Sequence, residues 1–213
     1  MTNYFPALLN IDYKKVVIVG GGHVAYQKLK ALLPTKANIV IVSPEIQENI
    51  VQLIEKTNIT WKQKVFEPKD LDDASVIFAA TNSEAVNDAV EEATQHWQLL
   101  SRADPHGRID FINPAVVRRG DFVVAISTSG ASPTLSRMIK GQLENQFDDS
   151  YAQYVDFLKE AREKVKMKML KSADQKFVLQ QLVNPQLLEW IQQGDMVRCH
   201  QFLQQLLSGE QTL

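Results

Sequence analysis

The chain has 213 residues and a formal net charge of −2, so it can bury a sizeable core in one large domain or in a medium domain with a smaller partner. Its single cysteine, Cys199, excludes an internal disulfide framework and a cysteine-based zinc site. No segment approaches the roughly 18 apolar residues of a membrane span, and the N-terminus lacks the basic and apolar regions of an export signal. We therefore expect a cytoplasmic protein that does not contact membranes.

The first half of the sequence alternates short apolar runs with helical patterns. Residues 15–19 (KVVIV) form a β-branched run that ends in three consecutive glycines, and residues 24–33 follow with helical spacing up to Pro34. Further strands are expected at residues 38–42, 60–64 and 76–80, and further helices at residues 45–56 and 84–96. The packed stripe of the last helix is expected to contain Ala85, Ala89, Val90 and Ala93. Alternating elements of this length predict an α/β fold with a Rossmann-type doubly wound parallel sheet.

The second half is mainly helical. Residues 122–126 (FVVAI) indicate one more strand, followed by a loop over 127–133 and a helix from 134 to about 147. A charged amphipathic helix is expected over 151–170, with an apolar side made of Tyr151, Tyr154, Val155, Leu158, Val165 and Met169. Two further helical patterns, interrupted at Asn184-Pro185 and at Gly194, finish the chain. The α/β half therefore ends somewhere between Asn113 and Ser150.

The pattern Gly20-x-Gly22-x-x-Ala25 lies between the first expected strand and the first expected helix. A glycine at position 20 permits a tight turn, and Gly22 lets the backbone approach a pyrophosphate at the helix N-terminus. The small Ala25 allows the helix to pack closely on the strand. The alternative is a glycine-rich turn without a ligand, but the repeated strand–helix pattern favours dinucleotide binding.

The end of the second strand indicates which dinucleotide is bound. An acidic residue often binds the ribose hydroxyls of NAD here, and this chain has Ser43, Pro44 and then Glu45, which is close enough to substitute. No lysine or arginine between residues 43 and 54 could hold the 2′-phosphate of NADP, so NAD is favoured. Further cofactor contacts are expected from His23, Val24, Thr81 and Asn82.

Basic residues gather between residues 102 and 140. Only three aspartates offset Arg102, Arg108, Arg118, Arg119, Arg137 and Lys140. In a chain that is acidic overall, this local excess suggests an anionic small molecule more than a nucleic acid. The alternative is a solvated surface of ordinary arginines.

Two polar loops in this region allow more than one interpretation. Asp104 begins Asp-Pro-His-Gly, which satisfies the requirements of a type I turn and on local chemistry alone favours a turn. The loop STSGASP over 127–133 could cradle a carboxylate or simply cap the helix that follows. No metal site is expected, since His23, His96, His106 and His200 show no ligand spacing.

Three segments in a fixed order carry a family resemblance: KKVVIVGGGHVAYQK, VIFAATNSEAVN and ADPHGRIDFINPAVVRRGDFVVAISTSGASPTLSR. Over residues 4 to about 143 the chain resembles the precorrin-2 dehydrogenase family, the N-terminal region of siroheme synthases. The resemblance implies NAD-dependent oxidation of precorrin-2 to sirohydrochlorin by a homodimer. It implies an NAD-binding domain over residues 1–113, a dimerisation segment over 114–150 and a helical C-terminal domain over 151–213.

The resemblance also implies site residues. The essential aspartate of the family falls on Asp104, which we expect to transfer a proton or to orient the pyrrole nitrogens of the substrate. Substrate contacts are expected from Arg102, Arg118, Thr128, Ser129, Ser132 and Arg137, because guanidinium groups pair with carboxylates in two-point geometry. The chain departs from the family pattern at Ser101, where asparagine is frequent, and at Arg102, where an apolar residue is common.

Two other functions stay open. Some relatives also insert ferrous iron to give sirohaem, a step in which Asp104 and His106 would remove pyrrole protons. A hypothesis of another class is a regulatory domain that senses NAD without turnover. That hypothesis gives no reason for the arginines and hydroxyls between residues 102 and 137.

Overall fold

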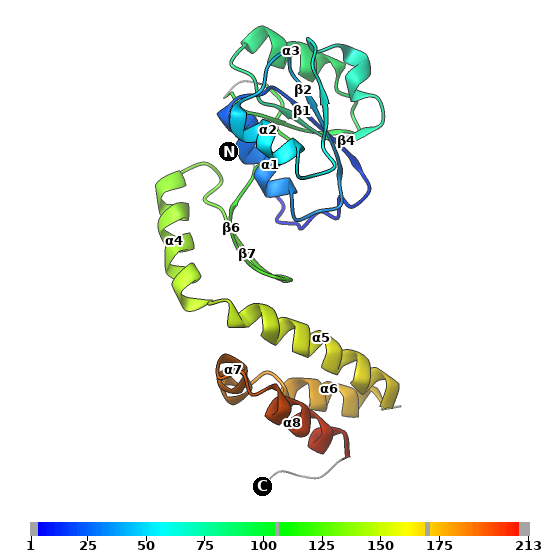
Figure 1. Cartoon of the computed structure of the whole chain (residues 1–213), viewed down its shortest axis with the longest axis vertical. Coiled ribbons are helices and arrows are strands. Elements are labelled where there is room, and N and C mark those ends of the chain that lie inside the picture. Colours follow the sequence, from blue (N-terminus) through cyan, green and yellow to red (C-terminus); the bar gives the residue numbers. More distant parts are fainter. Residues whose placement is uncertain (1–3, 105–106, 169–170, 209–213) are drawn as a thin grey trace. The chain divides into compact units, whose positions relative to one another are not determined.

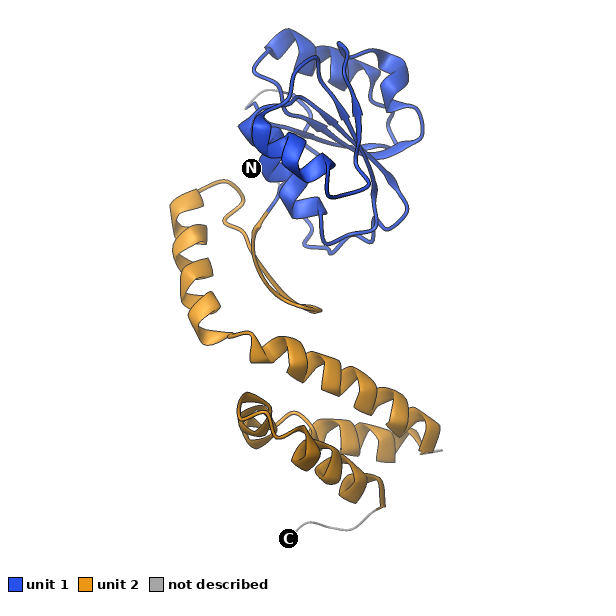
Figure 2. Ribbon diagram, in the orientation of Figure 1, with its two compact units in different colours: residues 1–113 blue, residues 114–213 orange. Residues whose placement is uncertain are grey.

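The computed structural model describes residues 4–104, 107–168 and 171–208, and it is shown in Figure 1. The chain divides into two compact units, residues 1–113 and residues 114–213, coloured separately in Figure 2. A further division at residue 150 stays a prediction.

A five-stranded parallel sheet forms the centre of the first unit, with strand order β3-β2-β1-β4-β5. The strands are β1 (Lys15–Val19), β2 (Asn38–Val42), β3 (Thr60–Lys62), β4 (Ala74–Ala79) and β5 (Leu99–Arg102). The central strand β1 pairs in parallel with β2 through Val17 and Val40 and with β4 through Val17 and Ile77. Because β2 and β4 flank β1, the strand order reverses there, which is where α/β folds bind ligands.

Helices cover both faces of this sheet. Val16 and Ile18 of β1 pack in one core with residues of α1 (His23–Leu32) and α2 (Glu48–Ile54). Val17 and Val19 point to the other face, where they pack with Val90 of α3 (Glu84–Ala93). A continuous apolar strand is thus buried on both sides, as a doubly wound sheet requires. The expected fold class is confirmed.

Several helix details differ from the sequence expectations. Helix α2 begins three residues later than expected, because the backbone at Glu45 packs against Gly21 instead of starting the helix. The buried residues of α3 are Asn87 and Val90, whereas Ala85 and Ala89 are exposed, so the expected stripe was half wrong. A short 3-10 turn, η1 (Pro68–Leu71), precedes β4.

The second unit opens with a β-hairpin. Strand β6 (Ala115–Arg119) pairs antiparallel with β7 (Phe122–Ile126), and Gly120 adopts φ +57° in the turn. Strand β7 was expected, but β6 was not, because its apolar run is short and ends in two arginines. Helix α4 (Pro133–Gln146) follows, and Ser132 caps its N-terminus.

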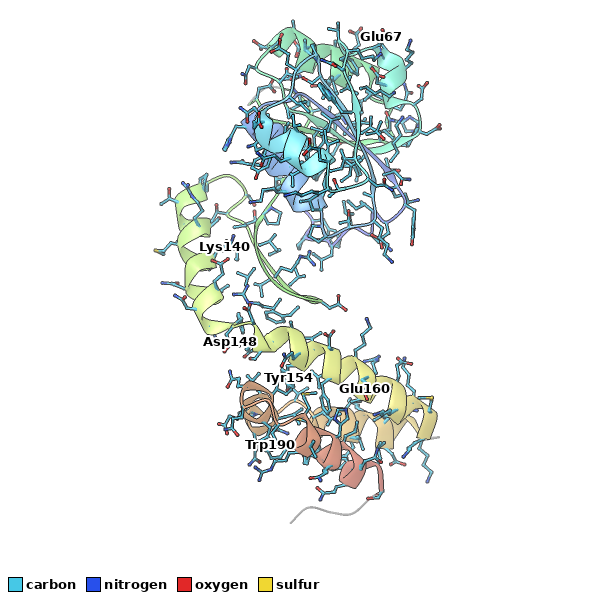
Figure 3. All side chains as sticks on the ribbon, in the orientation of Figure 1. Glu67, Lys140, Asp148, Tyr154, Glu160 and Trp190 are labelled. Carbon is cyan, nitrogen blue, oxygen red and sulfur yellow. The ribbon has the colours of Figure 1, made fainter. Side chains whose placement is uncertain are left out.

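Four helices complete the second unit around a core of their own: α5 (Ser150–Lys168), α6 (Ser172–Gln181), α7 (Pro185–Gln192) and α8 (Met196–Ser208). Three helices follow α5 instead of two patterns, since Asn184-Pro185 and Gly194 each separate two helices. The Tyr154 hydroxyl donates to the Leu182 carbonyl at 3.0 Å, which fastens α5 to the end of α6 (Figure 3). No helix in the described ranges combines the length and apolarity that crossing a membrane requires.

The buried side of α5 only partly matches the expected stripe. Its buried residues are Tyr154, Phe157, Ala161 and Val165. The prediction missed Phe157 and Ala161 because it followed one helical row and not the neighbouring row that faces the other helices. Met169, also predicted, lies outside the described residues.

Candidate active site

A cleft of about 440 Å³ opens at the carboxyl ends of β1, β2 and β4. Seven of the expected cofactor residues line it: Gly20, Gly22, Ser43, Pro44, Glu45, Thr81 and Asn82. Sequence analysis missed the other lining residues, among them Gly21, Gln47, Val65 and Phe66. His23 and Val24 are not part of this lining, and the exposed His23 ring lies 2.8 Å from the Gln27 amide nitrogen.

The three glycines of the turn differ in the space that is available for a side chain. Gly20 has φ +125°, and a Cβ there would lie 2.3 Å from the Ala80 carbonyl oxygen. A Cβ on Gly21 would lie 2.0 Å from the Glu45 carbonyl oxygen. A Cβ on Gly22 would meet no atom within 4 Å, although Gly22 is the N-cap of α1. The protein itself therefore leaves open the space before the helix N-terminus where a pyrophosphate would fit.

The end of β2 carries groups for the ribose side of the cleft. The Ser43 hydroxyl donates to the Glu45 carbonyl at 2.6 Å, so this buried hydroxyl is already engaged. The Glu45 side chain is exposed in the cleft lining. This arrangement leaves the Glu45 carboxylate as the acidic group at the strand end.

Two lysines enter the same region from the neighbouring strand. Lys62 and Lys64 each lie 3.0 Å from a carboxylate oxygen of Asp70, whose side chain is 1 % exposed. Burial opposes the ionisation of Asp70, but hydrogen bonds from the two lysines and from the Glu67 backbone N–H together outweigh it and lower its pKa. The search for a cation between residues 43 and 54 could not find these lysines, because the parallel pairing of β2 with β3 places Lys62 beside Val42, and Lys64 follows two residues later.

At the end of β5, Arg102 and Asp104 form a two-point ion pair. Arg102 Nε donates to Asp104 Oδ1 at 2.7 Å, and Nη2 donates to Oδ2 at 2.8 Å. The Arg102 side chain is 2 % exposed and that of Asp104 is 19 % exposed. Hydrogen bonds from Arg102 hold the pKa of Asp104 below its usual range, and the pairing raises the pKa of Arg102. Asp104 is therefore ionised at neutral pH.

The other side of the Arg102 guanidinium binds helix α3. Nη1 donates to Asp88 at 2.9 Å and to Glu91 at 2.6 Å. Arg102 was expected to bind substrate, but its guanidinium is buried and paired with three carboxylates. It is not placed to receive a substrate carboxylate, which corrects that expectation.

Gly107 and Arg108 pack against this network. Gly107 has φ +90°, and a Cβ there would lie 2.1 Å from Glu91 Oε2. The backbone N–H of Arg108 donates to the same oxygen at 3.0 Å. Pro105 and His106 lie outside the described residues, so the expected type I turn and the role of His106 stay predictions.

Asn87 links Asp104 with the cleft, and sequence analysis did not single it out. Its amide nitrogen donates to Asp104 Oδ2 at 2.7 Å, and its amide oxygen accepts from the Thr81 hydroxyl at 2.8 Å. The residue is 1 % exposed. A polar residue on the buried face of a helix is the signal that could have found it, because such a side chain needs partners.

The remaining predicted substrate residues belong to the second unit. Arg118 on β6 and Arg137 on α4 are both exposed. Ser132 accepts from the Leu135 N–H at 3.2 Å, and Thr128 accepts from the Ser132 N–H at 3.0 Å. Ser129 is exposed with φ +52°. The loop over 127–133 thus caps α4, as one of its two interpretations predicted.

Two other arginines of the basic segment are held by protein groups. Arg108 pairs with Asp110 at 2.9 Å, and Arg119 donates to the Glu144 carbonyl at 3.1 Å. Within the part of the chain that the structure describes, no three His, Cys, Asp or Glu side chains are grouped to hold a metal ion.

Three family models match successive parts of the chain. A model described as putative NAD(P)-binding matches residues 7–115. A model of the sirohaem biosynthesis protein central region matches residues 119–146, and a SirC C-terminal domain model matches residues 151–193.

Individual proteins give the same picture. A precorrin-2 dehydrogenase of Priestia megaterium is 31% identical over 202 residues, which cover 95% of this chain and 98% of that protein. A siroheme synthase of Nitrosomonas europaea is 29% identical over 97% of this chain but only 44% of its own length. The chain thus spans less than half the length of the siroheme synthases that it matches. The solved structure of "SirC, precorrin-2 dehydrogenase" matches with a TM-score of 0.79 and 30% identity, covering 95% of this chain and 98% of that one.

Proposed function

This chain belongs to the precorrin-2 dehydrogenase family, and from that membership we propose that it oxidises precorrin-2 to sirohydrochlorin in sirohaem biosynthesis, with NAD as hydride acceptor. One observation carries the proposal at the level of the site. Asn87 joins Thr81, which lines the cofactor cleft, to Asp104, the residue that matches the essential aspartate of the family.

The residues of the cleft fit the cofactor. The open backbone at Gly22 and the N-terminus of α1 would hold the pyrophosphate, and Glu45 would bind ribose hydroxyls. Thr81 and Asn82 would complete the binding site, with His23 and Val24 contributing from the first turn of α1. The bound cofactor supplies the hydride acceptor, while the protein orients the reacting groups.

The charges beside the cleft favour NAD over NADP. A 2′-phosphate would need a cation near the end of β2. The candidate cations are Lys62, the last residue of the neighbouring strand β3, and Lys64, two residues further along the chain. Asp70 binds both of them. Glu45 would in addition repel the phosphate.

The second unit would contribute substrate contacts. Precorrin-2 carries several carboxylates, and the exposed guanidiniums of Arg118 and Arg137 would pair with them in two-point geometry. Ser129 and the loop hydroxyls of Thr128 and Ser132 would offer further hydrogen bonds. Arg102 is not retained in this set.

We also propose a homodimer in which residues 114–150 form the dimerisation segment. Helix α4 exposes Leu135 and Met138, which lie three residues apart on one side of the helix. Contact with a second copy would remove these apolar side chains from water. A cytoplasmic location is proposed together with this biosynthetic role.

An anaerobic assay of NADH formation with precorrin-2 tests the activity. We expect NADH to form in proportion to the sirohydrochlorin produced. NAD binding without any turnover would instead support a sensing domain. Adding ferrous iron and sirohydrochlorin without NAD, and following sirohaem, tests the second activity separately.

A further inference from the structure

We infer that Arg102 and Asn87 are positioning residues that hold Asp104 as a fixed carboxylate, so that Asp104 binds the substrate as an anion and does not accept a proton. This inference rests on the proposed function. It replaces one of the two roles expected for Asp104, proton transfer, and strengthens the other, orientation of the pyrrole nitrogens.

The hydrogen bonds of Asp104 carry the first step. Its Oδ1 accepts from Arg102 Nε at 2.7 Å, and its Oδ2 accepts from Arg102 Nη2 at 2.8 Å and from the Asn87 amide at 2.7 Å. A carboxylate offers about four lone-pair positions, so these three side-chain bonds occupy most of them, and the backbone N–H of Asp104 also hydrogen-bonds to the carboxylate. All three donors are N–H groups that cannot accept a proton in return. Protonating either oxygen would therefore weaken one of these hydrogen bonds, and none of the three donors could accept a hydrogen bond from the new O–H group. We call these three hydrogen bonds the Asp104 clamp.

The burial of Arg102 carries the second step. Its side chain is 2 % exposed, so its charge depends on protein partners and not on water. Nη1 is occupied by Asp88 and Glu91, which leaves Nε and Nη2 to Asp104. If Asp104 were neutral, these two buried donors would face an uncharged group and the charge of Arg102 would lose a partner. The free-energy cost of that loss keeps Asp104 ionised.

The accessible part of the carboxylate gives Asp104 a function. It can accept a hydrogen bond from a pyrrole N–H, and Asp104 is partly exposed, with 19 % of its side chain accessible. In the proposed reaction the substrate loses two hydrogens. The hydride leaves a C–H bond with two electrons for NAD, and the proton passes to solvent water as a new double bond forms in the macrocycle. A fixed negative charge would stabilise the positive charge that develops on the macrocycle as the hydride leaves.

Direct observation of the carboxyl group tests the clamp without any turnover. The side-chain carboxyl carbon of Asp104 can be followed by NMR in protein labelled with ¹³C-aspartate, with Asp104→Asn identifying its signal. We expect this signal in the parent to stay that of a carboxylate from pH 8 to below about pH 4. Its titration in the neutral range would overturn the inference.

Variants then test the catalytic role through the pH profile of kcat. In Arg102→Leu we expect the Asp104 signal to titrate at higher pH and the acid limb of kcat to move up by at least about one pH unit. Arg102→Lys should shift the Asp104 titration and the acid limb of kcat by less, because lysine keeps the charge but loses the two-point geometry. This variant replaces Arg102→Leu in the test if Arg102→Leu does not fold. Asp88→Asn is the matched control: it alters the other side of the same guanidinium and should leave the limb in place. The carboxyls of the substrate contribute equally to every profile.

The outcomes separate the inference from the proposed function. If the NMR titration moves in Arg102→Leu while the acid limb of kcat does not, Asp104 is clamped but its charge is not what the reaction uses, and the inference falls. If no variant or parent forms NADH from precorrin-2 while the parent signal stays that of a carboxylate, the proposed function falls and the clamp remains.

Discussion

The guanidinium of Arg102 donates to both carboxylate oxygens of Asp104, at 2.7 and 2.8 Å, although a single residue separates the two in the chain. The pair forms where β5 ends, and the backbone N–H of Arg108 donates to Glu91, which also binds Arg102. A substitution at Asp104 therefore acts on a buried cation as well as on any reaction.

The first prediction concerns Asp104→Asn. On turn chemistry alone asparagine is a neutral replacement, but here its amide nitrogen or its single oxygen would leave at least one Arg102 donor unpaired. We expect unfolding to become easier by about 1–3 kcal/mol, the cost of an unsatisfied buried donor. Turnover of precorrin-2 should fall by roughly 10²- to 10³-fold, as when a fixed electrostatic partner is removed. Urea unfolding and kcat on the same preparation measure both effects.

A second substitution provides the control for this prediction. Arg102→Leu in the Asp104→Asn background removes the unpaired donor and should recover part of the stability without recovering activity. An Asp104→Asn protein that is as stable as the parent would show that the ion pair contributes little.

The second prediction concerns acid stability. Hydrogen bonds lower the pKa values of Asp104, Glu91 and Asp70 in the folded chain. Carboxyls with a lowered folded pKa stabilise the protein above their unfolded pKa, about 4, and lose this contribution as the pH falls through the folded values. The free energy of unfolding should therefore be nearly constant from about pH 7 to pH 5 and fall below about pH 4. A midpoint of urea unfolding that rises on acidification would contradict this assignment.

The third prediction separates two glycines of the same turn. Gly22 has an extended backbone that valine adopts readily, and a Cβ there meets nothing, so Gly22→Val should keep the melting temperature of the parent. Its side chain would occupy the path of the pyrophosphate and should abolish measurable NAD binding. Gly20→Val should instead lower stability by at least about 1–3 kcal/mol, because of its positive φ and the nearby Ala80 carbonyl. Calorimetry with NAD and thermal melting distinguish the two; unchanged affinity in a folded Gly22→Val protein would remove the pyrophosphate assignment.

Local patterns were sufficient to predict the centre of the fold. The run Lys15–Val19 is apolar at every position after the first and ends in glycines, so strand, turn and following helix are all encoded within one short segment. Strand β6 is the counterexample: only Val117 is buried, Arg118 is exposed, and two arginines end the strand, so the segment carries little apolar signal of its own. The segment forms a strand because it pairs antiparallel with β7, and this pairing is not visible in the local sequence of β6.

The candidate site was predictable only where neighbours in sequence are neighbours in space. The glycine turn and the end of β2 were found because each lies in one segment. Two of the three carboxylate partners of Arg102 lie on α3, 11 and 14 residues earlier, and nothing local to Arg102 indicates them. Lys62 reaches the end of β2 through strand pairing, and only the sheet order shows it.

The fourth prediction concerns cofactor choice. The parent should bind NAD more tightly than NADP, because Lys62 is paired with Asp70 and Lys64 is paired with Asp70 and Glu67. Asp70→Asn should raise the affinity for NADP by up to about fivefold, the worth of one exposed ion pair, through Lys62, because Lys64 keeps its ion pair with Glu67. NAD affinity should stay near that of the parent at temperatures where the variant is folded.

The control is Lys62→Gln and Lys64→Gln added to Asp70→Asn, which should remove the gain for NADP. Titration calorimetry measures the affinities of all three proteins for NAD and for NADP. If the parent binds NADP more tightly than NAD, the proposed preference for NAD is wrong.

The fifth prediction concerns the proposed dimer. Leu135 is 42 % exposed and Met138 is 54 % exposed on one side of α4. If this side contacts a second copy, Leu135→Glu with Met138→Glu would bury two carboxylates without partners in the interface. The free energy needed to remove these charges from water would exceed the free energy gained by dimer formation. Light scattering at micromolar concentration should change from a dimer to a monomer with an unchanged helical circular dichroism signal. Val197→Glu is the matched control, since Val197 is 69 % exposed but lies on α8, outside residues 114–150. A dimer that survives the double substitution in α4 but dissociates in the control would move the interface to the C-terminal helices, and a monomeric parent would remove the dimer altogether.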